Sequence, residues 1–390
     1  RRERDPAAEA ALTPFRVPAV AGALATFVLA LAGALIVGQS LAALAAGATR
    51  ERPAEISWLA PAYGLAALLV VAGIAIRLPG HDVTAAIALG IVLVVALVHL
   101  RGRIAGFGGA GALGLPVLLV TAVAAALPFA IIGYVGILGA GLVNDDMASH
   151  LIIADYVADP HDPVPSFVKG GYPIGPHALV AAIAAVTGAS LVDVFAGFTV
   201  ALAPLLGWVA LGALGGISRW RRILGACLVA LAYLGIAYLL QGAFKEPMMS
   251  ILLLGGALGL GSLIGLRAAG EEPSGEGTDD EPPVAHPALR ILPLAVLVAG
   301  VVFLYSLPGL LWVAAVFGHE GEPRAHRLDR HQSEAFIVRC RGEDRRAAEQ
   351  RADFGIAKPD AQHGIARQTA VGNDRLQIRH AEVRGDADNI

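Results

Sequence analysis

The sequence predicts an all-α protein, and specifically a polytopic helical integral membrane protein. Of its 390 residues, 56% are hydrophobic and only 16% are charged, whereas soluble domains contain about 25% charged residues. The apolar residues also form continuous runs of about 20, the length that a helix needs to cross a bilayer. A transmembrane β-barrel would show short alternating segments instead. The runs therefore indicate helices, whose backbone groups are satisfied within each segment.

About eight apolar segments are long enough to be transmembrane helices. After a polar N-terminal segment at 1–16, they lie at 17–47, 57–76, 82–100, 112–140, 191–217, 223–241, 247–266 and 289–317. The 47 glycines suit the close approach of helices in lipid. Because the first residue is Arg1, we expect the chain to begin inside a longer reading frame.

Arginines predict how these segments are oriented. They occur in loops after the first, third, fifth and seventh segments: Arg50 and Arg52, Arg101 and Arg103, Arg219, Arg221 and Arg222, and Arg267 and Arg290. If successive segments cross the membrane in alternate directions and residues 177–188 do not cross it, these loops share one side of the membrane. The positive-inside rule makes that side cytoplasmic. The loops 141–190 and 241–247 are then extracytoplasmic, in a bacterial inner or plasma membrane. The basic N-terminal stretch RRERD then lies on the extracytoplasmic side, which violates the positive-inside rule.

Two polar segments interrupt or follow the predicted transmembrane domain at 17–317. The segment 268–287 is acidic and rich in glycine and proline, which predicts a flexible cytoplasmic loop. The segment 318–390 is charged and hydrophilic, with few residues of core size. It is either a soluble, disordered tail or a stretch read out of frame, because out-of-frame GC-rich DNA yields such compositions. We assign it no functional residue.

The stretch GLVNDDMASHLIIADYV at 141–157 begins the long extracytoplasmic loop. A helix over 145–158, at about 100° per residue, puts a polar arc on one side that holds Asp145, Asp146, Ser149, His150 and Tyr156. Asp155 falls on the apolar side. This pattern predicts an interfacial amphipathic helix, too short to span. Asp146 and His150, four residues apart, can touch. Alternatively, Asn144 or Asp145 simply caps the helix.

The loop continues with further polar residues. Lys169 precedes a Gly-Gly pair, and YPIGPHAL follows, with Tyr172 and His177. Pro176 fits the first turn of a helix that runs to about Thr187 and that we expect in the interface. Lys245 lies on the same side of the membrane, either near the aspartates or as a snorkelling interfacial lysine. Asp193 is expected to cap the next helix.

The features over about 130–225 resemble the GT-C superfamily of polytopic membrane glycosyltransferases. The features are NDDMASHLIIADYV, GGYPIGPHAL, the break TGAS, a spanning helix and the basic end SRWRR. Members often carry an acidic pair in the first large extracytoplasmic loop, followed by a proline-containing segment and a juxtamembrane helix. This sequence departs from that pattern because three additional segments precede the loop and the double-proline form is missing. The chain would be a fragment or a frame-disrupted copy.

The resemblance implies a function and roles for the loop residues. Such enzymes move a sugar from a polyprenyl-phosphate donor to an acceptor, here a cell-envelope glycan or protein. Asp145 or Asp146 would be the catalytic base or hold a divalent metal, Mg²⁺ or Mn²⁺, because neighbouring carboxylates suit hard cations. His150 would orient a carboxylate or bind that metal. The candidate substrate-binding residues are Lys169, Tyr172, His177 and Lys245, the cations among them neutralising the leaving phosphate.

Two other classes stay open. A multi-pass transporter or permease would place ionisable residues near the membrane centre on broken helices, and Pro116, Pro128 and Pro204 interrupt predicted helices. A non-catalytic membrane assembly protein would need none of the polar loop residues. The sequence shows no P-loop and no dinucleotide-binding fingerprint, and we expect no nucleic-acid partner.

Overall fold

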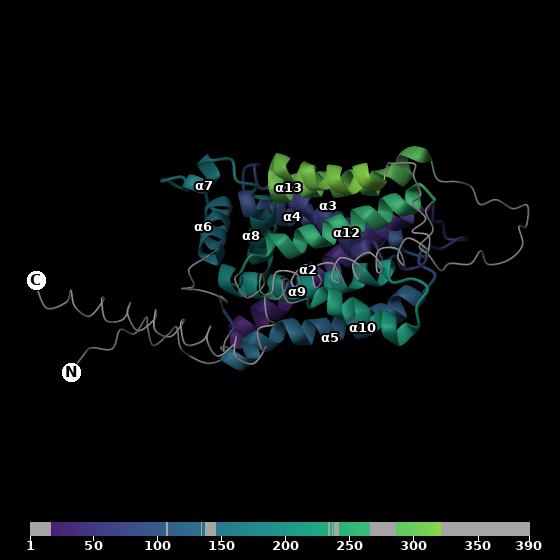
Figure 1. Cartoon of the computed structure of the whole chain (residues 1–390). Helices are drawn as coiled ribbons and strands as arrows, with labels where there is room; N and C mark the ends of the chain where they lie inside the picture. Colours follow the sequence, from purple (N-terminus) through teal and green to yellow (C-terminus); the bar gives the residue numbers. More distant parts are fainter. Residues whose placement is uncertain are drawn as a thin grey trace, which may run out of the picture. The chain divides into compact units, whose positions relative to one another are not determined.

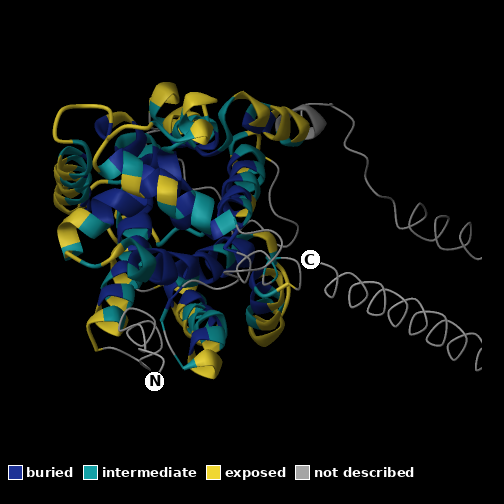
Figure 2. Ribbon diagram, turned by 90° about the vertical axis from the view of Figure 1, so that its left-hand side faces the viewer, coloured by how far each residue is buried: buried dark blue, intermediate teal, exposed yellow. Residues whose placement is uncertain are grey.

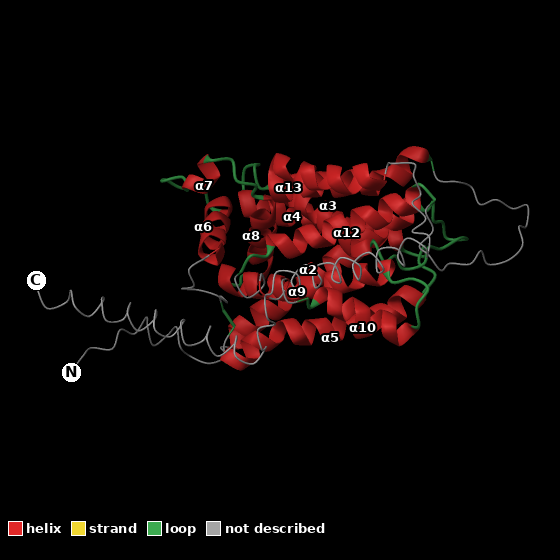
Figure 3. Ribbon diagram, viewed as in Figure 1, coloured by secondary structure: helices red, strands yellow, loops and turns green. Residues whose placement is uncertain are grey.

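The computed structural model of the chain describes residues 17–106, 108–133, 135–136, 146–232, 235, 237, 242–265 and 286–320, with side chains to 316. Within these ranges every regular element is a helix, and Figure 3 shows helices joined by loops without a strand. The all-α fold class predicted from the sequence is therefore confirmed.

Six of the helices are long and apolar enough to cross a membrane. They are α2 (Val17–Ala45), α4 (His81–Leu100), α5 (Gly109–Ile132), α9 (Leu191–Ala213), α12 (Lys245–Leu263) and α13 (Pro287–Glu320) (Figure 1). The shorter helices are α3 (Ala60–Ala75), α6 (Asp146–Ala158), α7 (Ser166–Lys169), α8 (Gly175–Thr187) and α10 (Arg219–Ala230). The chain is a multi-pass membrane protein.

Among the described residues, six helices have the length expected of a spanning helix, compared with about eight segments predicted from the sequence. The segment 57–76 forms α3, which has only 16 residues, because residues 46–59 form a loop and Pro61 stands in the first turn of the helix. The segment 223–241 corresponds to α10, which has 12 residues and begins in the arginine cluster at Arg219. Most of 233–241 lies outside the described residues.

The interior of the bundle is built around α3 and α9. Thirteen of the sixteen residues of α3 are buried, and α9 is the most enclosed of the spanning helices. Glycine allows the backbones to touch where α2 crosses α3: a Cβ on Gly38 would overlap the carbonyl of Ala60, and one on Gly64 would overlap the carbonyl of Ala34. Small residues at such crossings are the usual means of packing helices in lipid.

The outer surfaces of the bundle are apolar. Figure 2 shows buried residues gathered inside and exposed ones on the outward faces of the helices. The exposed apolar residues include Val94 and Val98 on α4, Val123 on α5 and Leu311 on α13. An apolar outer surface of this extent suits lipid contact.

Three arginine-bearing loops meet at one end of the bundle, as the sequence predicted. The backbone of Ala54 hydrogen-bonds to Arg103, with N···O 2.8 Å. Arg222 stacks on Trp58, with its guanidinium carbon 4.4 Å from the ring centroid. Trp208 of α9 donates to the carbonyl of Ser57 at 3.2 Å.

The helices α6, α7 and α8 lie together at the other end (Figure 1). The helix α6 covers nearly the predicted range, but its buried face differs from the prediction: Met147, His150, Ile153, Ala154 and Val157 are buried. His150 therefore belongs to the buried face, whereas Asp155 is exposed. This stripe packs against α8, so contact with another helix decides which side of α6 is buried.

The helix α8 ends at Thr187, as predicted, but it does not lie on the surface. Nine of its thirteen residues, Gly175 to Ile183, are buried among the neighbouring helices α3, α4, α6 and α9. Pro176 stands in its first turn. Ser190 caps the following helix, α9, by accepting from the Asp193 N–H at 3.2 Å and donating to the Asp193 carboxylate at 2.7 Å. Asp193 thus takes part in the cap that the sequence predicted.

The helix α13 is kinked at Ser306, whose φ of 56° and ψ of −149° are not helical. Pro308 follows two residues later and lacks the N–H that would continue the backbone ladder. The kink lies at the same end of the bundle as α6 and α8, because Gly175 of α8 packs against the carbonyl of Phe303.

Candidate functional site

Six side chains from separate parts of the chain form one cluster at this end of the bundle. They come from α6, from the loop before α8, from α8 itself, from the start of α12 and from the kinked part of α13. We call them the histidine–lysine cluster: His150, Tyr172, His177, Phe244, Lys245 and Tyr305. Ring contacts join all six, so the cluster is continuous.

Two buried histidines form the centre of this cluster. Nδ1 of His150 lies 3.0 Å from Nε2 of His177, within hydrogen-bond distance. His150 is 5% exposed and His177 is fully buried. The edge of Phe244 packs against His150, with ring centroids 4.6 Å apart. Gly242, just before Phe244, lies against Met147 of α6, where a Cβ would overlap the methionine side chain.

Both histidines are neutral at neutral pH. Burial lowers the pKa of His150 to about 4, and the positive charge of Lys245 contributes to the shift. Burial also lowers the pKa of His177 well below its ordinary value, with smaller contributions from His150 and Lys245. Burial disfavours the protonated form of an imidazole, because the charged ring loses its hydration. The pair therefore acts through its hydrogen bond and not through charge.

The tautomers of the two rings follow from their partners. Nδ1 of His177 is fully buried and has no hydrogen bond of normal geometry among the described residues. The backbone carbonyl of Pro173 interacts with this ring and slightly opposes the lowering of its pKa. A proton on Nδ1 of His177 would face that acceptor, so we assign it there. His177 Nε2 then accepts from Nδ1–H of His150, which leaves a lone pair on Nε2 of His150.

Lys245 is a buried cation held between two aromatic rings. It is 3% exposed, and its Nζ lies 4.0 Å from the ring centroid of Tyr172 and 4.7 Å from that of Tyr305. The hydroxyl of Tyr305 donates to the Glu246 carboxylate at 2.5 Å. Cation–π contacts contribute about 0.5–2 kcal/mol each, which offsets part of the cost of burying the ammonium.

Tyr172 connects the cluster to the acidic start of α6. Burial, with smaller contributions from the negative charges of Glu246 and Asp146, raises the pKa of the Tyr172 hydroxyl to about 12. Tyr172 therefore stays protonated and can donate a hydrogen bond. The negative charge of Asp146 therefore acts on a member of the cluster.

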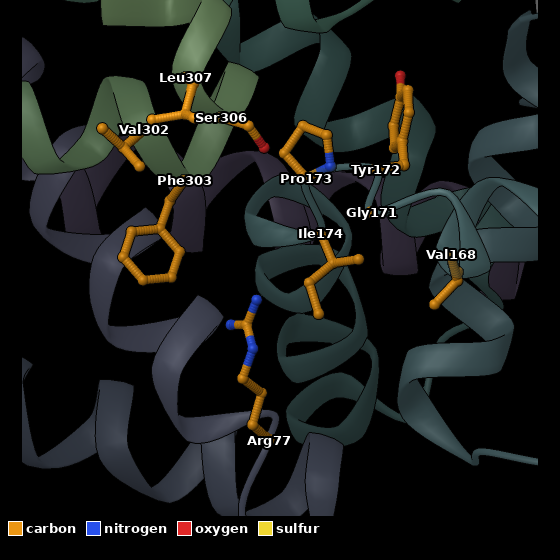
Figure 4. A pocket seen from close by; sticks show the side chains of 10 residues that line it. All are labelled: Arg77, Val168, Gly171, Tyr172, Pro173, Ile174, Val302, Phe303, Ser306 and Leu307. Atoms are coloured by element: carbon orange, nitrogen blue, oxygen red, sulfur yellow. The ribbon is translucent and has the colours of Figure 1, made fainter.

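A cavity of about 480 Å³ adjoins the cluster at Tyr172. It lies between the end of α3, the loop before α8 and the kink of α13 (Figure 4). Its walls are mostly apolar, and the polar side chains at its wall are those of Arg77, Tyr172 and Ser306. Tyr172 thus belongs both to the cavity and to the cluster.

The structure brings together four of the residues singled out in the sequence, namely His150, Tyr172, His177 and Lys245. Asp146 is the first residue of α6 and is half-buried. Asp145 lies outside the described residues. Lys169 is exposed at the end of α7 and takes no part in the contacts of the cluster.

Sequence reasoning missed Phe244, Tyr305 and Arg77. Tyr305 and Ser306 stand alone as polar residues in a long apolar run, which is a signal that a site lies nearby. Arg77 is the only lysine or arginine between the predicted segments 57–76 and 82–100. Phe244 carries no such signal, because an aromatic residue beside a spanning helix is common.

The described residues do not by themselves supply a metal site. No three histidine, cysteine, aspartate or glutamate side chains within the described ranges lie close enough to hold an ion. His150 directs Nδ1 to His177, which leaves only its other nitrogen. The predicted divalent metal at Asp145 and Asp146 is untested, since one of the pair lies outside the described residues.

Comparison of the chain with known protein families, with curated proteins and with solved structures finds no match.

Proposed function

We propose that the protein is a membrane glycosyltransferase that moves a sugar from a polyprenyl-phosphate donor to a cell-envelope acceptor. One observation carries the proposal. Four residues that the sequence singled out for this function, at 150, 172, 177 and 245, meet in one cluster although the chain separates them by up to 95 positions.

Sugar transfer requires the removal of a proton from the acceptor. The acceptor hydroxyl oxygen bonds to the anomeric carbon, and the bond from that carbon to the phosphate oxygen breaks with its electrons going to the phosphate. Asp146 is the candidate base that takes the hydroxyl proton.

His150 is suited to orient the acceptor in this proposal. Being neutral, it offers the lone pair on Nε2 as a hydrogen-bond acceptor, while His177 fixes the ring through Nδ1. Buried partners that lock a ring in one tautomer pre-organise a site for reaction. A fixed imidazole about one helical turn from Asp146 would hold a sugar hydroxyl beside the carboxylate.

Lys245 is the candidate group that neutralises the leaving phosphate. Its ammonium is fixed between Tyr172 and Tyr305, so it needs little rearrangement when charge develops on the phosphate. The Tyr172 hydroxyl is protonated and can donate to the same oxygen. Lys169, which is exposed, is less suited to this role than the sequence suggested.

The test is transfer of radiolabelled sugar from membrane polyprenyl-phosphate donors by membranes that contain the wild-type chain or the double variant Asp145→Ala/Asp146→Ala. Loss of a general base lowers turnover by about 10²–10⁴-fold. Asp155→Ala is the matched control, because Asp155 is an exposed carboxylate on α6, and its turnover should equal that of wild type. Equal turnover of the double variant would remove the proposal.

A permease is the second candidate, and the kink of α13 at Ser306 favours it. Transporters bind solutes at breaks in spanning helices, and here the break lines a cavity. A permease would show solute uptake that depends on Ser306 and Lys245, with no transfer of sugar to an acceptor.

A further inference from the structure

The cavity beside α13 combines one cation with apolar walls. Its lining residues are Arg77, Val168, Gly171, Tyr172, Pro173, Ile174, Val302, Phe303, Ser306 and Leu307. No acidic side chain is among the described residues that line it, so its wall carries a net positive charge. Its volume of about 480 Å³ falls within the range of about 300–1,000 Å³ typical of small-ligand pockets.

Arg77 has hydrogen-bonding capacity to spare at this cavity. One guanidinium N–H group donates to the carbonyl of Gly73, and the guanidinium carbon lies 5.7 Å from the ring centroid of Phe303. These two contacts fix the direction of the side chain. A guanidinium carries five N–H donors, so most of them are left for a ligand. Figure 4 shows the guanidinium directed into the cavity.

Ser306 supplies a second polar group. Its backbone is held at a φ of 56°, a conformation that is strained in a residue other than glycine. Its hydroxyl lies beside Pro173 at the wall of the same cavity (Figure 4), and no other described residue hydrogen-bonds to it. Strained residues concentrate at ligand sites.

The apolar part of the cavity continues onto the outer face of the bundle. Leu307 lines the cavity and is 73% exposed, and Leu311, one turn further along α13, is 74% exposed. Because α13 is long and apolar enough to span a membrane, this strip faces lipid. A ligand could therefore place an anionic group at Arg77 and an apolar chain along α13.

We infer that the Arg77 cavity binds the phosphate-bearing headgroup of a lipid, with the phosphate on Arg77 and Ser306 and the chain along Leu307 and Leu311. A guanidinium matches phosphate oxygens through paired N–H groups. This inference stands apart from the proposed glycosyl transfer, because it requires only a phosphorylated lipid and no sugar.

The test measures binding of tritiated farnesyl phosphate to the purified chain in phosphatidylcholine nanodiscs, by scintillation proximity. We expect saturable binding to wild type, and a dissociation constant raised at least about tenfold in Arg77→Gln, since a charged hydrogen bond is lost. Arg221→Gln is the matched control: this arginine is exposed and stacks on Trp220, with 5.4 Å between guanidinium carbon and ring centroid. It should bind like wild type.

Competition separates the sources of the phosphate. Displacement by farnesyl phosphate but not by equimolar inorganic phosphate or farnesol supports a lipid headgroup. Displacement by inorganic phosphate at equal concentration would overturn the lipid and leave a free-phosphate site. If farnesol displaces the probe as effectively as farnesyl phosphate does, Arg77 has no role in binding. The same conclusion follows if Arg77→Gln binds farnesyl phosphate like wild type.

A measurement on the wild-type chain guards against misfolding of the variant. Phenylglyoxal modifies accessible arginines, and peptide mass spectrometry reports each site. Farnesyl phosphate should protect Arg77 and leave Arg221 reactive. Equal modification of Arg77 with and without the ligand would overturn the inference. Sugar transfer is not measured in either experiment, so failure here leaves the proposed function intact.

Discussion

The neutral histidine pair makes stability depend on pH. His150 has its pKa lowered from an ordinary value of about 6.5 to about 4, so between these values the unfolded chain binds a proton that the folded chain excludes. Stability then rises with pH and is lost as pH falls from about 6.5 towards 4. For His150 alone the loss is about 2 kcal/mol by pH 5.

We therefore predict that the melting temperature of the purified chain in detergent falls between pH 7.5 and pH 5. The variant His150→Gln/His177→Gln should lose most of this slope, whatever its absolute stability. His161→Gln is the control, because His161 is exposed in the same loop, and it should keep the wild-type slope. An unchanged slope in the double variant would show that the pH dependence arises elsewhere.

Lys245 should affect activity and stability in opposite directions. Lys245→Met keeps the length of the side chain and removes the buried charge. Replacing a buried ion with an apolar group is often neutral or stabilising, so the melting temperature should hold or rise. Under the proposed function, sugar transfer should fall by about 10²–10³-fold, the usual cost of losing one group that stabilises developing negative charge. A parallel loss of folding and activity would instead make Lys245 structural.

At the scale of helices, packing between α2 and α3 depends on glycine. A Cβ on Gly64 would overlap the carbonyl of Ala34, and overpacking costs about 1–3 kcal/mol. Gly64→Ala should lower the melting temperature. Gly90→Ala, within α4, is the control, since no atom lies within 4 Å of its Cβ position; there the better helix propensity of alanine should leave stability unchanged or raise it. Equal melting temperatures would argue against the close crossing.

The sequence predicts helices better than it predicts their faces. Hydrophobic length located all six spanning helices, because apolar runs are a strong signal. The face of α6 was misjudged since His150 was grouped with the polar residues, whereas its contact with His177 makes it part of the buried stripe. Likewise, the length of α8 indicated a helix too short to span, but its burial among four helices follows from tertiary packing that no local pattern contains.

At the scale of the whole molecule, the site was only partly predictable. Its loop residues could be recognised because polar residues at the mouth of an apolar segment stand out. The partners Phe244 and Tyr305 could not, because they belong to other spanning segments and reach the loop residues only through the fold. The cavity at Arg77 depends on the kink at Ser306, which the sequence signals only through Pro308.

The orientation of the helix bundle in the membrane decides from which side substrates can reach the site. The arginine-bearing loops gather at the end opposite to the histidine–lysine cluster, and the positive-inside rule places that end in the cytoplasm. The cluster would then face the extracytoplasmic side. Labelling of single cysteines with an impermeant maleimide tests this arrangement, in a background that carries Cys227→Ala and Cys340→Ala.

Ser166→Cys lies on α7 near the cluster, and Arg52→Cys lies in an arginine-bearing loop; both positions are exposed. In right-side-out membrane vesicles we expect labelling of Ser166→Cys at once and of Arg52→Cys only after the vesicles are opened with detergent. The contrasting pattern, with Arg52→Cys labelled first, would put the cluster in the cytoplasm. An extracytoplasmic acceptor could not then reach Asp146, and the proposed transfer to the cell envelope would fail on geometry alone.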